Sequence, residues 1–344
     1  MVFHLGSIWR LYEAGVLKDL KRISSVSGGS ITAAMLGLAW DQLSFDPKKI
    51  ESDFVPRFIA PVRALASKTI DQNSVLGGIF LPGDIADKIA NAYRNRLYGD
   101  KTLQDLPDFP LFVINATNVQ SGALWRFTKH FMRDWRVGEV KKPTVDLAVA
   151  VAASSAFPPV LSPLELQLDP ADFTPGSGED LQREPFTSDV VLTDGGVYDN
   201  LGLETAYKRL KTILVSDAGG KLQAEAEPKT DWARHSYRVL NVIDNQVRSL
   251  RKRQLIDAYK RDERSGAYWG IRSDISRYQL DQTLPAPLAR TQELADTPTR
   301  LKRLDPEWQE RLINWGYAVT DAALRKHVDS ALPMGGFPYP QVGV

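Results

Sequence analysis

A serine-rich turn near the start of the chain has the residue types of a nucleophile site. The stretch ISSVSGGS (23–30) precedes the apolar run ITAAMLGLAW, and this order predicts a strand, a tight turn and a helix. An acyl-transfer serine is usually presented on such a turn, where the helix N-terminus stabilises negative charge. Ser27 takes this place, Gly28 would donate its N–H to an oxyanion, and Gly29 completes the turn. The stretch therefore predicts a nucleophile at position 27.

Two other interpretations of this turn stay open on the stretch alone. Ser27 or Ser30 can act as the N-cap residue of the following helix. A glycine turn at a helix N-terminus can also bind a phosphate group. A second functional group elsewhere in the chain is needed to choose among the three.

The base that a serine nucleophile needs is predicted at Asp194. A hydroxyl is a poor nucleophile unaided, so a proton acceptor must stand beside it. Asp194 ends the apolar run VVLT and enters Gly195-Gly196, at a strand end, where the active sites of parallel sheets gather. Partial burial would raise the pKa of its carboxyl toward neutrality, as a base requires. The two glycines and Asn200 are expected to support the turn, whereas the alternative is a structural aspartate in an Asp-Gly hairpin.

Other candidates for acid–base chemistry have weaker support. None of the histidines follows a strand end next to glycines, so each is expected on the surface or in packing: His4, His130, His235 and His327. His235 is the nearest candidate for a Ser–His–Asp triad, although its surroundings predict a helix. Asp199 is a minor alternative as the base, and Asp217 is expected in a structural turn.

Composition narrows the classes of protein to which the chain can belong. Its 344 residues include 43 Lys and Arg against 42 Asp and Glu, so the net charge of +1 gives no indication of nucleic-acid binding. The absence of cysteine excludes disulfides and cysteine nucleophiles. No metal or nucleotide motif is present, and neither a metal nor a cofactor is expected. No signal peptide and no apolar run of about 18 residues is visible, so we expect a cytoplasmic protein whose membrane contact is peripheral.

The order of predicted elements indicates one α/β domain. Strands, some of which run into turns, are expected at 22–26, 110–119, 189–200, 211–220 and 267–271. Helices are expected at 2–14, 30–40, 84–97, 145–157, 233–260 and 305–327. Strands that alternate with helices predict a mostly parallel central sheet covered on both faces. Residues 1–220 would form the sheet core and residues 221–344 a helical extension packed on it.

The predicted helix 233–260 carries a basic cluster, made of Arg248, Arg251, Lys252 and Arg253. Two interpretations stay open for it. The cluster is either a solvated helix face or a surface that contacts anionic lipid headgroups.

Three motifs taken together resemble the patatin-like phospholipases: RISSVSGGSI, ASSAFPPV and TDGGVYDNLGLE. That family consists of serine lipolytic acyl hydrolases with a Ser–Asp dyad. The resemblance implies a three-layer α/β/α fold, with Ser27 as the nucleophile and Asp194 as the base. It also implies an acyl-enzyme intermediate, a lipid or phospholipid ester as substrate, and no cofactor. Ser25 stands where the G-x-S-x-G motif of the family has its first glycine, and serine is also small.

One part of the family pattern has no counterpart in this sequence. Relatives carry a glycine-rich oxyanion loop between their first strand and first helix, whereas residues 1–6 already have helical spacing. We therefore expect either a start that lies upstream or a truncated form, and His4 is not expected to replace the loop. Two alternative functions follow: an α/β-hydrolase-type esterase with a Ser–His–Asp triad, or a catalytically impaired lipid-binding protein.

Overall fold

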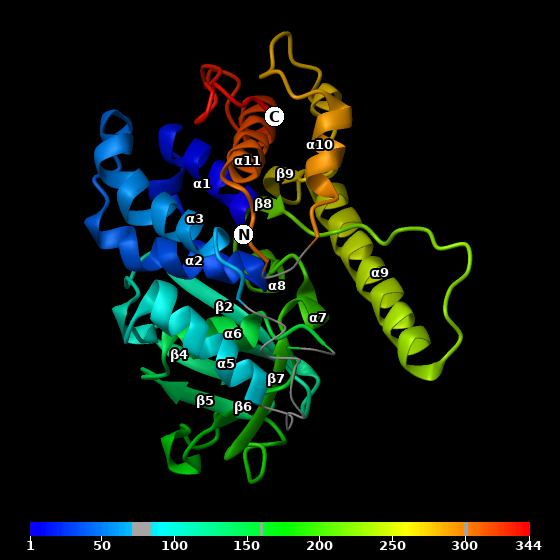
Figure 1. The fold of residues 1–344 in the computed structure, drawn as a ribbon. Helices are drawn as coiled ribbons and strands as arrows, with labels where there is room; N and C mark the ends of the chain where they lie inside the picture. The colour runs from blue at the N-terminus through cyan, green and yellow to red at the C-terminus, as the bar shows by residue number, and fades with distance from the viewer. Residues whose placement is uncertain (71–83, 159–160, 299–301) are drawn as a thin grey trace.

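The computed structural model describes residues 1–70, 84–158, 161–298 and 302–344, and Figure 1 shows their arrangement. The helices are α1 (Val2–Glu13), α2 (Gly28–Ala39), α3 (Ala60–Ala66), α5 (Asp84–Tyr93), α6 (Leu147–Ser154), α7 (Gly196–Asp199), α8 (Glu204–Tyr207), α9 (Trp232–Lys260), α10 (Leu288–Ala295) and α11 (Pro306–His327). The strands are β1 (Arg22–Ser25), β2 (Leu111–Asn118), β3 (Ala123–Phe127), β4 (Phe131–Asp134), β5 (Gly138–Lys141), β6 (Leu164–Gln167), β7 (Asp189–Asp194), β8 (Thr212–Asp217) and β9 (Ser265–Gly270). Wider helical turns of the π type form at Ile50–Ile59 and Arg94–Tyr98.

The helices expected from apolar spacing are confirmed, with small shifts at their ends. α11 begins where Asp305 and Pro306 predict it, because proline fits the first helical position. α9 begins after Asp231, whose carboxylate accepts a hydrogen bond from the Arg234 N–H. α2 begins at Gly28, directly after Ser27 and two residues earlier than expected.

The central sheet is mainly antiparallel, so the prediction of a mostly parallel sheet is wrong. Its strands are ordered β5-β4-β3-β2-β7-β6 with antiparallel neighbours, and β1 pairs with β2 in parallel. The connections explain the difference, because only a few residues separate β2, β3, β4 and β5, and a parallel crossover needs a dozen or more. β8 and β9 form a separate two-stranded parallel sheet.

Helices lie against both faces of the central sheet. Successive side chains of β2 point to opposite faces. On one face, Phe112 contacts Trp40 at the end of α2, with ring centroids 5.7 Å apart. On the other face, Thr117 Oγ1 accepts a hydrogen bond from the Tyr198 N–H of α7. The protein is therefore of the mixed α/β class.

The first and last long helices pack at very short distance through glycines. A Cβ on Gly6 of α1 would lie 1.8 Å from the Ile313 oxygen, and a Cβ on Gly316 of α11 would lie 2.0 Å from the Phe3 oxygen. Arg10 of α1 forms a buried ion pair with Asp321 of α11, with 2.8 Å between Nε and Oδ1. α11, near the end of the chain, therefore covers α1, near its start.

The part of the chain after β8 is mostly helical and also contains β9. α11 packs on β9 as well as on α1, and α9 packs on α7 and β9. The division into a core and an extension at residue 220 stays a prediction. Within the described residues, no helix combines the length and the apolar character that a bilayer span needs.

Candidate active site

Ser27 lies between β1 and α2 in a backbone conformation that residues other than glycine rarely adopt. Its φ is +50°. Strain of this kind is about 1–3 kcal/mol and persists where the surrounding structure holds it. Here the Ser27 N–H is held by the carbonyl oxygen and the Oγ of Ser154, at 3.0 and 3.1 Å. The Ser27 side chain makes no cap hydrogen bond to α2, so its hydroxyl is not occupied in capping the helix.

The two glycines after Ser27 have different hydrogen bonds. The Gly29 N–H donates to the Val26 oxygen at 2.9 Å and so belongs to the turn itself. The Gly28 N–H has no hydrogen-bond partner among the described residues. It lies at the start of α2, where the helix dipole favours negative charge. The amide of Gly29 is therefore occupied and that of Gly28 is not, and the role of Gly28 as oxyanion donor stays a prediction.

Asp194 ends β7 with its side chain buried, since the residue is only 1% exposed. Its Oδ1 accepts the Gly196 N–H at 2.7 Å. Burial raises the pKa of its carboxyl to about 7, the charge of Asp244 adds to the rise, and hydrogen bonding from Gly196 and Ser27 opposes it. Its Oδ2 is buried without a hydrogen bond of normal distance and angle from any described residue. The Ser27 hydroxyl is close enough to this carboxyl to oppose the rise of its pKa.

The glycines after Asp194 are required by the packing of the turn. A Cβ on Gly195 would lie 2.2 Å from the Asn115 oxygen of β2, and a Cβ on Gly196 would lie 2.9 Å from Asp194 Oδ1. Thr117 of β2 donates a hydrogen bond to the Asp194 oxygen at 2.8 Å. The turn is therefore fixed against β2 from two sides, which holds the carboxyl in place.

Ser154 links the two turns and was not singled out from the sequence. Its carbonyl oxygen accepts the N–H groups of Ser27, at 3.0 Å, and of Gly195, at 3.2 Å. Its Oγ lies 2.8 Å from Ser30 Oγ, which in turn donates to Ser25 Oγ at 3.0 Å. The sequence signal was the motif ASSAFPPV, of which residues 159–160 lie outside the described part of the chain.

The histidines divide into one beside the serine turn and three elsewhere. A Cβ on Gly29 would lie 3.9 Å from His4 Nε2, and His4 Nδ1 lies 2.9 Å from Ser216 Oγ. Burial holds the pKa of His4 well below its usual value, so its imidazole is neutral. His130 contacts Asp108, His235 is exposed on α9, and His327 packs on a tyrosine ring. No contact within the described residues brings these three to Ser27.

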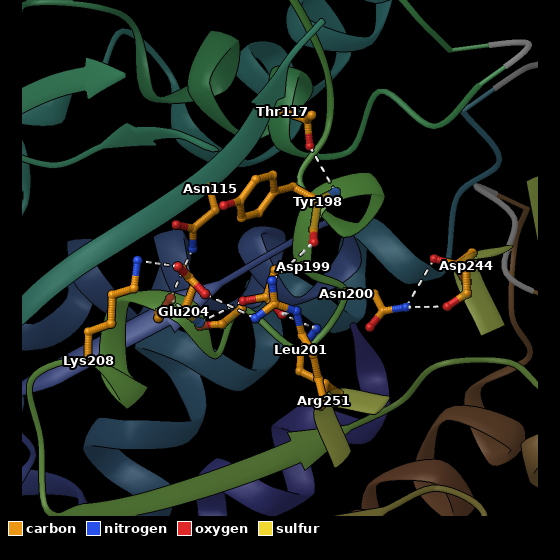
Figure 2. A network of polar contacts seen from close by, with 12 residues as sticks. Asn115, Thr117, Tyr198, Asp199, Asn200, Leu201, Glu204, Lys208, Asp244 and Arg251 are labelled. Atoms are coloured by element: carbon orange, nitrogen blue, oxygen red, sulfur yellow. Dashed lines mark hydrogen bonds and ion pairs between the residues drawn. The ribbon is translucent and has the colours of Figure 1, made fainter. Parts of the chain in front are cut away.

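Figure 2 shows polar contacts of Asp199 and Asn200 with α9 and with the residues that follow them. Asp199 accepts hydrogen bonds from the Leu201 and Glu204 N–H groups and lies 3.4 Å from Arg251 Nε. This carboxyl is fully engaged, which disfavours Asp199 as the base. Asn200 donates to the carbonyl oxygen and the side chain of Asp244, at 3.0 Å each. Asn200 therefore ties α7 to α9 and does not bond the glycine turn directly.

The basic cluster of α9 is divided between these contacts and solvent. Arg248 pairs with Asp244 at 3.2 Å, and Arg251 pairs with Glu204 at 3.0 Å. The Lys252 ammonium lies 4.4 Å from the centre of the Tyr268 ring. Much of the cluster therefore serves internal packing, which neither earlier interpretation anticipated. Asp217 likewise has a structural environment, since it accepts hydrogen bonds from Tyr268 Oη and the Gly219 N–H.

The family assignment rests on the comparison of the sequence with known families. The sequence profile of the family described as patatin-like phospholipase matches residues 1–207, which contain both turns and Ser154. A comparison with curated proteins finds no match. The matched segment covers more than half of the chain and confirms the resemblance seen in the three motifs. The chain belongs to the patatin-like phospholipase family.

Proposed function

We propose that this protein is a serine acyl hydrolase that cleaves carboxylic esters of lipids and phospholipids, with Ser27 as nucleophile and Asp194 as base. Family membership supports a lipid substrate. One observation carries the proposal: the Ser154 oxygen binds the N–H of Ser27 and the N–H of Gly195, so the two functional turns meet at a single atom. A hydroxyl and a carboxyl held in this way have little freedom to separate.

In the first half of the reaction, Asp194 takes the proton of the Ser27 hydroxyl while Oγ attacks the ester carbonyl carbon. The carbonyl oxygen becomes an oxyanion, and the Gly28 N–H at the start of α2, which has no partner among the described residues, would donate to it. The C–O bond to the leaving alcohol then breaks, and Asp194 returns the proton to that alcohol. The acyl group is left as an ester on Ser27.

In the second half of the reaction, a water molecule takes the role of nucleophile that the Ser27 hydroxyl has in the first half. Asp194 takes one proton of the water, whose oxygen attacks the acyl carbon, and the Ser27–acyl bond breaks. The proton returns to Ser27 Oγ, and the fatty acid is released. A base whose pKa is about 7 suits both halves, because it accepts and returns a proton near neutral pH.

The test compares the unmutated protein with Ser27→Ala and Ser52→Ala. Two substrates are used: a water-soluble short-chain ester and a phosphatidylcholine in mixed micelles. Ser27→Ala should lower hydrolysis of both by at least about 1,000-fold, since the nucleophile is lost. The matched control is Ser52→Ala, because Ser52 is an exposed serine away from the site that donates only to the Lys49 oxygen. If Ser27→Ala kept the activity of Ser52→Ala on both substrates, the proposal would be wrong.

A further inference from the structure

α9 buries one face and leaves an apolar stripe on the other. Arg251, Leu255 and Tyr259 contact the body of the protein. In Figure 1 the N-terminal half of α9, which follows the loop after β8, extends away from the sheet and the other helices. From its start to Leu250, α9 carries six large exposed apolar side chains, which a solvated helix does not need. Two of them, Tyr237 and Val242, lie on other sides of the helix. The remaining four form a stripe: Trp232, Val239, Ile243 and Leu250.

The spacing of this stripe places it on one line along the helix. Steps of seven, four and seven residues fall within an arc of about 40° at 3.6 residues per turn. The side chains that contact the body lie on roughly the opposite side of the same helix. Trp232 is 84% exposed, Ile243 55% and Leu250 57%. The stripe therefore faces solvent along about 27 Å of helix.

The charge of α9 is far from that of the whole chain. The chain has a net charge of +1, whereas α9 contains seven Lys or Arg against two Asp. One of these acids, Asp244, is already bonded to Asn200 and Arg248 on the side of the body. Arg253 and Lys260 lie on one flank of the stripe and have no ion-pair partner among the described residues. The outer side of α9 is therefore apolar from Trp232 to Leu250 and basic along an edge, and the exposed Asp257 lies beyond Leu250 on the line of the stripe.

We propose that the outer face of α9 binds an anionic lipid surface and brings the active site to its substrate. An amphipathic helix with tryptophan and aliphatic residues between basic side chains lies in the plane of a membrane interface. Anionic headgroups complement the basic flank, and an exposed tryptophan prefers the boundary between headgroups and acyl chains. His235 and Gln246 interrupt the stripe, which a helix of a second copy would bury poorly but lipid headgroups tolerate.

The position of α9 relative to the active site supports this role. Asn200 lies six residues after Asp194 and donates two hydrogen bonds to Asp244, in the middle of α9. A helix resting on a bilayer would therefore place the aspartate turn close to the same surface. This inference rests on the proposed function for its meaning, although lipid binding itself does not require catalysis.

The experiment measures flotation of the full chain with vesicles of phosphatidylcholine and phosphatidylglycerol. All proteins carry Ser27→Ala, so that the vesicles stay intact. The test variant replaces three stripe residues with glutamine, a good helix former: Trp232→Gln, Ile243→Gln and Leu250→Gln. The matched control replaces three similarly apolar exposed residues outside α9: Leu288→Gln, Val328→Gln and Met334→Gln. Thermal unfolding checks that both variants keep the fold.

We expect the stripe variant to bind vesicles at least about tenfold more weakly than the control, because three apolar side chains no longer leave water. Binding should also weaken when salt is added and on vesicles of phosphatidylcholine alone. Equal flotation of both variants would overturn the inference, as would a parent protein that fails to float. A dimer in sedimentation that only the stripe variant abolishes would also overturn it, in favour of a second copy.

A separate measurement keeps this inference distinct from the proposed function. With the serine restored, the stripe variant should hydrolyse a water-soluble ester as the control does and hydrolyse vesicle lipid more slowly. Hydrolysis of vesicle lipid at the rate of the control would contradict a role in reaching substrate. Flotation without any ester hydrolysis by the unmutated protein would leave the lipid surface standing and refute the hydrolase.

Discussion

The carboxyl of Asp194 determines how the proposed reaction depends on pH. Its pKa is raised from 3.8 to about 7, mainly by burial, and only the ionised form can accept the Ser27 proton. We therefore expect kcat/KM on a soluble ester to rise tenfold per pH unit below about 7 and to level off above it. A pH–rate profile from about pH 5 to 9 tests this expectation.

The control for that profile is another aspartate at a strand end. Asp194→Asn should lower the rate by at least about 1,000-fold, because asparagine cannot accept the proton. Asp217→Asn should keep the profile of the unmutated enzyme, since Asp217 bonds Tyr268 and Gly219 outside the site. A rate that is flat across the range would contradict Asp194 as the base.

Gly195 tests whether the turn needs the absence of a side chain. Gly195→Ala would place a Cβ 2.2 Å from the Asn115 oxygen, so the backbone of the turn or of β2 must shift. We expect a lower melting temperature and a loss of activity larger than 100-fold, because a shift of about 1 Å at a catalytic group has that effect. Gly220→Ala is the control, since a Cβ there meets nothing within 4 Å. Equal stability and activity of the two variants would contradict this account of the turn.

The catalytic candidates could be predicted from local sequence, whereas the residues that contact their turns could not. Ser27 and Asp194 stand next to glycines at the ends of apolar strands, so residue type and neighbours indicate both. The contact of Ser154 with Ser27 spans 127 positions and depends on how α6 meets two strands. His4 was expected in packing or on the surface, and only the folded chain places it beside Gly29.

Among the elements, the contact between α1 and α11 has a direct test. Gly316→Ala would place a Cβ 2.0 Å from the Phe3 oxygen, so the two helices must separate. Overpacking of this kind typically destabilises a protein by about 1–3 kcal/mol. The rate should also fall, because the first turn of α1 carries His4 beside the serine turn. Urea unfolding and kcat/KM measure the two effects.

Gly336→Ala is the control for that test, since a Cβ on Gly336 meets nothing within 4 Å. We expect this variant to unfold and react like the unmutated protein. If Gly316→Ala matched Gly336→Ala in urea unfolding and in kcat/KM, the close approach of α1 and α11 would contribute nothing to stability or activity.

Helices were easier to predict than the pairing of strands. Apolar spacing over many residues indicates α1, α9 and α11 with little ambiguity. β3, β4 and β5 have only five, four and four residues, too few for apolar alternation to indicate them clearly. Strand direction depends on the connections between strands, and the expected elements include none between residues 120 and 141, where three antiparallel pairs form.

The stability of the whole molecule depends on contacts between residues 1–207, which the family profile matches, and the rest of the chain. α1 lies within residues 1–207 and packs against α11, which lies outside them. A chain ending at residue 207 would expose the apolar face of α1 and remove Asp321 from Arg10. We expect it to lose cooperative thermal unfolding, as measured by circular dichroism, whereas the full chain should unfold in one transition. A truncated chain that unfolds cooperatively would show that residues 1–207 fold alone.

The central claim is that Ser27 forms the covalent intermediate, and the most direct measurement is to locate an adduct on it. A fluorophosphonate probe phosphonylates an activated serine, and mass spectrometry of the digested protein identifies the modified residue. We predict a single adduct, on the peptide that contains Ser27, which is lost in Ser27→Ala and kept in Ser52→Ala. An adduct on a different serine, or no adduct on the active protein, would contradict the account.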